Sequence, residues 1–183
     1  TSGTKVDFVR DGIDAAIRLG AKPVPDLHDE LLLPEALCLV ASPDVAAAVG
    51  DRPENLYTYP LIVDNGSMLT ADFKDITAQA TEEALELLQL DLERLDLRIY
   101  HQSDTVVLAA LAGHGVALTR QSLCTDDLKA GKLAGVCDFQ MPMELGYSLV
   151  CPTTRQEDPR LLAFKRWMIG EIADQRETGI QQT

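Results

Sequence analysis

Short apolar runs alternate along this chain with segments in which apolar residues recur every three or four positions. An apolar run bounded by proline, glycine or asparagine predicts a buried strand, and the longer period predicts a helix. Prolines interrupt the segment 21–35, which is predicted to have little regular structure. Strands are predicted at 13–19, 36–41, 61–64, 95–100, 115–119 and 146–151. Helices are predicted at 4–12, 43–49, 81–89 and 104–112, then a helical turn in "DDLKAGKL" and a terminal helix from Asp158 or Pro159 to about Gln175.

This alternation favours an α/β fold in which helices cover both faces of a mostly parallel sheet. Ser103 is predicted to cap the helix 104–112, because serine side chains accept hydrogen bonds from the first free N–H groups of a helix. That helix is apolar on nearly every side, so it is expected to be buried on more than one.

Length and charge narrow the class of protein. A chain of 183 residues fits one ordinary domain or two small lobes. Its formal net charge of −13 argues against a surface for nucleic acid, since binding to phosphates needs clustered lysine and arginine. No apolar run approaches the roughly 20 residues that span a bilayer, so no membrane partner is expected.

Cysteine and histidine residues show no pattern typical of a metal or cofactor site. The four cysteines, Cys38, Cys124, Cys137 and Cys151, form no CxxC pair, and each is interpreted as a small buried apolar residue in a reducing cytoplasm. The three histidines lie far apart. His101, Ser103 and Asp104 are the residue types of a hydrolase triad, but they are too close in sequence to form one. We therefore expect no cofactor, no metal and no enzymatic activity.

The segment 100–104 is the strongest candidate for a ligand site. Open α/β sheets bind ligands at the carboxyl ends of their strands, and a helix N-terminus offers free N–H groups to anions. Here a predicted strand ends and a predicted helix begins, with His101, Gln102 and Ser103 at the junction. The alternative is that Ser103 only caps the helix.

Other polar residues at predicted strand ends are weaker candidates. Asp64, Asn65 and Ser67 follow one buried strand, although a turn explains Asn65 by itself, and Thr119 ends another. Arg18 lies in an otherwise apolar strand, where it either pairs with a carboxylate such as Asp14 or binds an anionic ligand.

Seven segments carry a resemblance to a known family. The chain contains, in order, "DFVRDGIDAAIRLG", "LCLVASPDV", "YPLIV", "SDTVVLAALAGHGVALTRQSL", "DLKAGKLAGV", "GYSLVCP" and "LLAFKRWM". In this wording and order it resembles the effector-binding domain of LysR-type transcriptional regulators, in particular the subgroup that includes the glycine cleavage activator. The segment 68–94 departs from that subgroup because it lacks a tryptophan-rich stretch and carries an acidic helix instead.

The resemblance implies a fold like that of periplasmic binding proteins, with two α/β lobes, two crossover strands and a small polar or anionic effector in the cleft between them. Residues 1–39 and 150–183 would form lobe one, residues 40–149 would form lobe two, and "LCLVASP" and "YSLVCP" would be the crossovers. In the family, residues that correspond to His101, Gln102 and Ser103 commonly line the effector pocket.

The resemblance also implies partners and a missing part. Family members pair their effector domains, so a homo-oligomer is expected. Their DNA-binding winged helix-turn-helix, and the first strand and helix of lobe one, have no counterpart in this sequence. The chain is therefore expected to be N-terminally truncated, with DNA bound only through the absent domain. The alternatives are a solute-binding protein of a transporter and an enzyme on the same scaffold.

Overall fold

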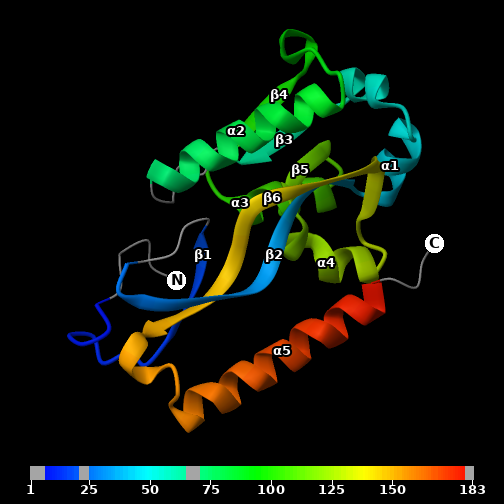
Figure 1. The fold of residues 1–183 in the computed structure, drawn as a ribbon. Helices are drawn as coiled ribbons and strands as arrows, with labels where there is room; N and C mark the ends of the chain where they lie inside the picture. The colour runs from blue at the N-terminus through cyan, green and yellow to red at the C-terminus, as the bar shows by residue number, and fades with distance from the viewer. Residues whose placement is uncertain (1–6, 21–24, 65–70, 180–183) are drawn as a thin grey trace. The chain divides into compact units, whose positions relative to one another are not determined.

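The computed structural model describes residues 7–20, 25–64 and 71–179. Within these residues six strands form one sheet, in the order β1-β6-β2-β5-β3-β4 (Figure 1). The strands are β1 (Ala16–Gly20), β2 (Leu27–Ala41), β3 (Leu61–Asp64), β4 (Leu97–Tyr100), β5 (Val116–Arg120) and β6 (Ala134–Pro152). The α-helices are α1 (Pro43–Val49), α2 (Ala71–Leu87), α3 (Ser103–Leu111), α4 (Gln121–Lys129) and α5 (Pro159–Gly179). Short 3-10 turns occur at η1 (Pro53–Thr58), η2 (Leu92–Arg94) and η3 (Thr153–Arg155).

The sheet is mixed, whereas the sequence predicts mostly parallel sheets. β3 runs parallel to both β4 and β5, as the alternation of strands and helices predicts. β5 is antiparallel to β2, and β1 is antiparallel to β6. Each antiparallel pair includes one of the two long strands, β2 or β6, which Figure 1 shows.

The chain divides into two compact units, and each is described by itself. Unit 1 consists of Thr1–Glu35 and Glu144–Thr183, and unit 2 of Ala36–Met143. Both β2 and β6 contribute residues to each unit. The lobes implied by the family resemblance, 1–39 with 150–183 and 40–149, have boundaries four to six residues from these.

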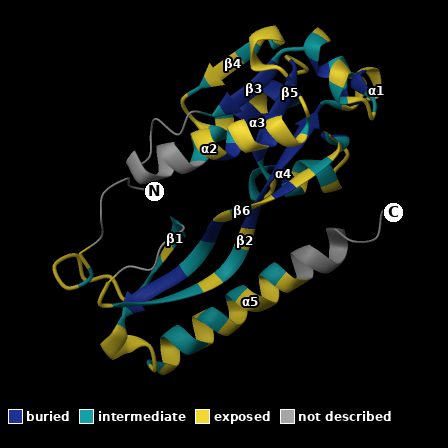
Figure 2. Cartoon of the chain, turned by 45° about the horizontal axis from the view of Figure 1, so that its top comes forward, coloured by how far each residue is buried: buried dark blue, intermediate teal, exposed yellow. Residues whose placement is uncertain are grey.

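Unit 2 has a buried layer on each face of its part of the sheet. Along β2, Leu37 and Leu39 join one apolar cluster, and Cys38 and Val40 join the other, as the two-residue period of a strand requires. Residues of α1, η1 and α2 pack in the first cluster and residues of α3 and α4 in the second. Figure 2 shows the buried strands β3 and β5 beneath α3.

Unit 1 is built from β1, the ends of β2 and β6, and α5. Its buried side chains come mainly from β6 and include Leu149, Val150 and Cys151. An ion pair joins α5 to β2, with Lys165 Nζ 2.9 Å from Glu30 Oε2.

Several predicted elements are wrong in type or length. No helix occupies 7–12, because the Asp7 side chain accepts hydrogen bonds from the N–H groups of Val9 and Arg10 and holds this segment as turns. The segment 27–35 is part of strand β2 despite Pro34, since it pairs within the sheet. α2, α4 and β6 are longer than predicted.

Candidate functional site

The best candidate site lies in unit 2, at one edge of the sheet. Asp64 is the last residue of β3, Arg120 the last of β5, and Ser103 the first of α3. Because β3 and β5 are parallel, their carboxyl ends meet at the same edge. The fold therefore brings a carboxylate, a guanidinium and a hydroxyl together where α/β sheets bind ligands.

Hydrogen bonds connect these three side chains. The Ser103 hydroxyl donates to Asp64 Oδ2 and accepts a hydrogen bond of 3.1 Å from Arg120 Nη2. Thr119, only 4% exposed, contributes a further hydroxyl beside them. The site thus presents a positive charge, a negative charge and hydroxyl groups within a partly buried setting, where electrostatic interactions are stronger than in bulk water.

A small cavity of about 20 Å³ lies against this network, which is room for one water molecule. Two threonines of α2 also line it, with the Thr81 hydroxyl donating a hydrogen bond of 2.9 Å to the Thr77 carbonyl, and leucine and methionine residues complete the wall. The residues that line it are Leu37, Asp64, Thr77, Thr81, Ser103, Leu118, Thr119, Arg120 and Met143.

Three of the residues predicted from the sequence, Asp64, Ser103 and Thr119, meet at this cavity. His101 and Gln102 immediately precede α3 and are exposed, and they are not among the residues that line the cavity. Asn65 and Ser67 lie outside the described residues.

Arg18 lies elsewhere, in unit 1. Its Nη1 is 3.7 Å from Asp29 Oδ2, so a carboxylate lies beside it as one of the two sequence alternatives expects, although that carboxylate is Asp29 and not Asp14. Asp14 instead forms an ion pair with Arg155. Asp29 is not predicted as the partner, because it belongs to a segment that its prolines predict to have little regular structure.

The predicted capping role of Ser103 is also wrong. Gln102 occupies the cap position of α3, and no side chain makes a capping hydrogen bond there. The Ser103 hydroxyl is engaged by Asp64 and Arg120 instead. Arg120, Thr77 and Thr81 are not predicted as site residues from the sequence. For Arg120 a signal exists, since it directly follows the apolar strand that ends at Thr119.

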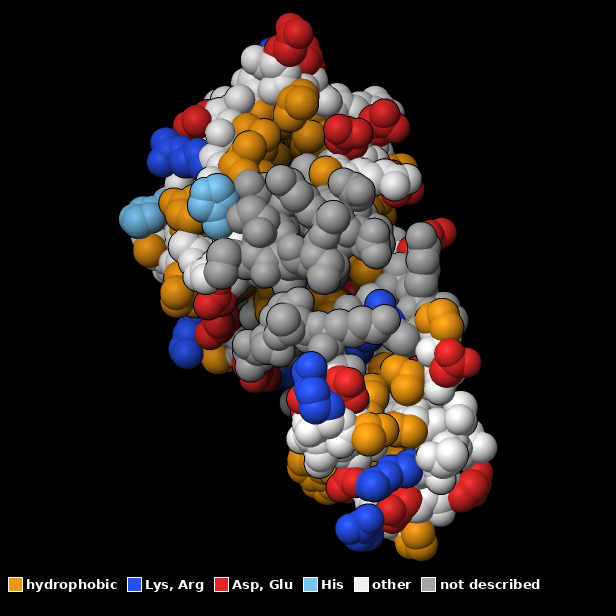
Figure 3. All heavy atoms as spheres, turned by 90° about the vertical axis from the view of Figure 1, so that its left-hand side faces the viewer, with side chains coloured by type: hydrophobic (Ala, Val, Ile, Leu, Met, Phe, Trp, Pro, Cys, Tyr) orange, Lys and Arg blue, Asp and Glu red, His pale blue; other side chains and the backbone are white. Residues whose placement is uncertain are grey.

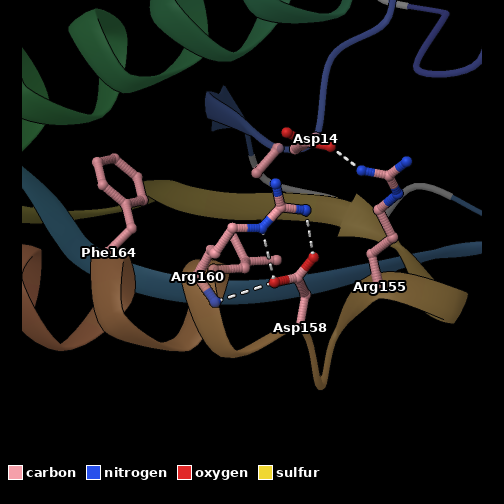
Figure 4. A pocket seen from close by; sticks show the side chains of 7 residues that line it. Asp14, Arg155, Asp158, Arg160 and Phe164 are labelled. Carbon is pink, nitrogen blue, oxygen red and sulfur yellow. Dashed lines mark hydrogen bonds and ion pairs between the residues drawn. The ribbon is translucent and has the colours of Figure 1, made fainter.

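Unit 1 has a larger hollow of about 280 Å³ at the start of α5 (Figure 4). Arg155 pairs there with Asp14, and Arg160 Nη2 lies 2.8 Å from Asp158 Oδ2. The side-chain and backbone hydrogen bonds of Arg160 lower the pKa of Asp158 to about 2. Both arginines of this hollow are thus paired with aspartates of the same hollow, which neutralise their charge. The hollow is therefore the weaker candidate for binding a charged ligand.

The described residues include no group of three or more His, Cys, Asp or Glu side chains arranged to hold a metal ion. Nor, in that part of the chain, is any helix long and apolar enough to cross a membrane. On the face drawn in Figure 3, lysine and arginine side chains lie next to aspartate and glutamate side chains and form no continuous basic surface.

A mixed α/β sheet with helices and two compact units defines a class, the periplasmic-binding-protein-like fold. Solved structures share it. The effector domain of the transcriptional regulator AmpR of Pseudomonas aeruginosa has a TM-score of 0.72 and 21% identity, covering 98% of this chain and 82% of that one. The AmpR effector binding domain from Citrobacter freundii has a TM-score of 0.68 and 21% identity, covering 94% of this chain and 80% of that one.

The chain belongs to the LysR substrate binding domain family, whose profile matches residues 1–173. It is 28% identical over 180 residues to the glycine cleavage system transcriptional activator of Escherichia coli (strain K12), covering 93% of this chain and 53% of that relative. It is 27% identical over 172 residues to the HTH-type transcriptional activator AmpR of Providencia stuartii, covering 94% and 54%. The chain thus spans about half the length of the curated relatives it matches.

Proposed function

We propose that this chain is the effector-binding part of a LysR-type transcription regulator, and that it binds a small polar or anionic molecule at the Asp64–Ser103–Arg120 network. The observation that carries this proposal is the hydrogen-bonded network itself, at the strand ends of a fold whose relatives are transcription regulators. On this proposal the two units are the two lobes of the effector-binding domain, and the chain works in the cytoplasm.

The chemistry of the network favours an anionic group on the ligand. Arg120 presents a planar guanidinium that suits a carboxylate or phosphate, and charge-assisted hydrogen bonds are stronger than neutral ones. The threonine hydroxyls at the cavity add donors and acceptors without further charge. One oxygen atom of the anionic group would occupy the cavity, and the rest of the ligand would lie outside it.

In this proposal the chain senses and does not itself contact DNA. Its formal net charge of −13 disfavours binding to phosphates. DNA binding is therefore assigned to a part of the regulator other than these 183 residues. Effector binding would shift the population of conformations that the DNA-binding part reads.

Thermal unfolding in the presence of small carboxylates, phosphates and amino acids tests the proposal. A ligand that binds the folded chain raises the unfolding temperature in a saturable way. Arg120→Gln should weaken binding by roughly 10- to 100-fold, because a hydrogen bond to a charged group contributes about 1.5–3 kcal/mol. Ser103→Ala should weaken it less.

Arg98→Gln is the matched control, because Arg98 is an exposed arginine on β4 that pairs with Asp96 at 3.1 Å. It should leave ligand affinity unchanged. Gln102→Leu distinguishes two positions for the site. It should leave ligand affinity unchanged if the ligand binds at the cavity, because Gln102 is exposed and does not line it, and it should weaken binding if the ligand binds at the predicted junction 101–103. A ligand that binds the Arg120→Gln and Ser103→Ala variants as tightly as the parent would show that the site lies elsewhere.

We also propose that the chain forms a homo-oligomer. The support is an apolar side chain on the outer side of α3, Leu108, which is 62% exposed, and another, Ile99, on the edge strand β4. On this proposal the two side chains would be covered by a second copy of the chain.

A further inference from the structure

Two cysteines that are far apart in sequence have their sulfur atoms next to each other inside unit 2. Cys38 lies on β2 and Cys124 in α4, 86 positions later, and their Sγ atoms are 3.5 Å apart. Both belong to the apolar cluster that α3 and α4 form against the sheet. The effector site described above uses neither thiol.

We propose that Cys38 and Cys124 are a modification site, a dithiol that hydroperoxides convert reversibly to a disulfide. A disulfide has an S–S length of about 2.05 Å, so the two sulfur atoms must approach by roughly 1.5 Å. This inference holds whichever ligand the effector site takes.

The reaction balances with one hydroperoxide molecule per disulfide. The thiolate of one cysteine attacks a peroxide oxygen, the O–O bond breaks, and water leaves to give a sulfenic acid. The second thiol then attacks the sulfenic sulfur, the S–O bond breaks, and a second water leaves with the thiol proton. Two thiols lose two electrons in all, and hydrogen peroxide is reduced to two water molecules.

The two cysteines differ in access to solvent, which assigns their order of reaction. Cys38 keeps 8% of its surface exposed, whereas Cys124 is completely buried. Cys38 is therefore the residue that meets the oxidant, and Cys124 is the residue that resolves the sulfenic acid. Burial of the resolving thiol at 3.5 Å also protects the sulfenic acid from further oxidation, because the second step is intramolecular.

The other two cysteines are poorer candidates. Burial raises the pKa of the Cys137 thiol, and the carboxylates of Asp51 and Glu54 raise it further. Burial also raises the pKa of the Cys151 thiol, with an added contribution from Glu30. More decisively, among the described residues neither sulfur lies beside a second thiol as Cys38 and Cys124 do, so neither has a partner for a disulfide. These two cysteines therefore serve as internal controls.

The disulfide would act on the segment that carries Thr119 and Arg120. Cys38 is paired with Thr119 in the sheet, and its thiol donates to the Thr119 carbonyl at 3.5 Å. The Cys124 thiol donates to the Gln121 carbonyl at 3.4 Å. A covalent bond between the two sulfurs would tie the first turn of α4 to β2 and fix the junction between β5 and α4.

The experiment uses the full chain, first reduced and then exposed to hydrogen peroxide at neutral pH. The native protein should lose two of its four thiols, counted after denaturation. Peptide mapping without reductant should recover one linked peptide that contains Cys38 and Cys124, and dithiothreitol should restore both thiols. The unfolding temperature of the oxidised chain should rise by several degrees, because a cross-link across a long loop restricts the unfolded chain.

Variants sharpen the result. Cys38→Ala should slow the loss of thiols at least tenfold, and the matched control Cys151→Ala should still lose two. The proposal is overturned if the native chain keeps all four thiols, or if Cys38 is recovered linked to Cys137, to Cys151 or to a second copy. Mapping on the unaltered chain decides the matter even where Cys124→Ala fails to fold.

Discussion

At the scale of single residues, one glycine is needed where strand β5 begins. Gly115 has a φ of +152°, and a Cβ atom placed there would meet the carbonyl oxygen of Pro60. The same carbonyl accepts a hydrogen bond of 2.9 Å from the N–H of Val116, so it has little freedom to move away. The strand that starts here ends in Thr119 and Arg120 at the candidate site.

Gly115→Ala should therefore lower the free energy of unfolding by about 2–3 kcal/mol, as overpacking against fixed backbone does. Urea unfolding followed by circular dichroism measures it. The control is Gly135→Ala in β6, where a Cβ atom meets nothing within 4 Å, and stability should change by less than about 0.5 kcal/mol. Equal effects of the two substitutions would contradict the packing described around Pro60.

At the scale of elements, local patterns predict the helices and strands whose apolar residues recur with a clear helical or strand period. α1 and β3 have the predicted bounds, and α3 is displaced by one residue. β2 is missed over 27–35 because prolines argue against a strand locally, whereas pairing with distant segments decides the outcome. α2 is missed over 71–80, where three of the five apolar residues are alanines, which mark a helical face only weakly.

The candidate site follows the same division. The rule that ligands bind at strand ends finds Asp64, Ser103 and Thr119 from the sequence alone. It does not find Thr77 and Thr81, because they reach the cavity from a helix whose start is not predicted. A local pattern also does not show that the Ser103 hydroxyl forms hydrogen bonds with Asp64 and Arg120. It predicts a hydrogen bond to the N–H groups of the helix terminus instead.

The attachment of α5 to β2 should depend on pH. The hydrogen bond from Lys165 lowers the pKa of Glu30 below its ordinary 4.5, so this pair stabilises the fold above that pH. The contribution is lost as pH falls through the lowered pKa. Because the Glu30 side chain is 36% exposed, solvent screening limits the contribution to about 0.5 kcal/mol.

Lys165→Met should thus be less stable than the parent by about 0.5 kcal/mol at neutral pH, with the difference shrinking as Glu30 becomes protonated. Urea unfolding at a series of pH values measures this difference. In a Glu30→Gln background the same lysine substitution should have no pH-dependent effect. A difference that persists with Glu30 protonated would assign the loss to packing of the lysine stem.

At the scale of the whole molecule, α3 bears on association between copies. The sequence predicts that this apolar helix is buried on more than one side. In the structure its buried residues, all within unit 2, are Val106, Val107, Ala109 and Ala110. What remains is Leu108 on the outer side.

Leu108→Gln should leave the free energy of unfolding within about 0.5 kcal/mol of the parent and should weaken self-association. Light scattering over a range of concentrations measures the association. Val107→Gln is the contrasting substitution, since it places an amide in the core and should destabilise unit 2. If the parent chain stays monomeric at every concentration, the oligomer proposed for this chain is wrong.

The division of the sequence between the two units has a consequence for biosynthesis. Unit 2 is one uninterrupted stretch, whereas unit 1 is assembled from segments on either side of it. A ribosome releases the chain from its N-terminal end, and domains generally fold as units during synthesis. Unit 2 is therefore complete while the later half of unit 1 is still being translated. Until β6 emerges, the nascent β1 and the early part of β2 present open strand edges. In this interval a chaperone would protect these edges from pairing with other chains.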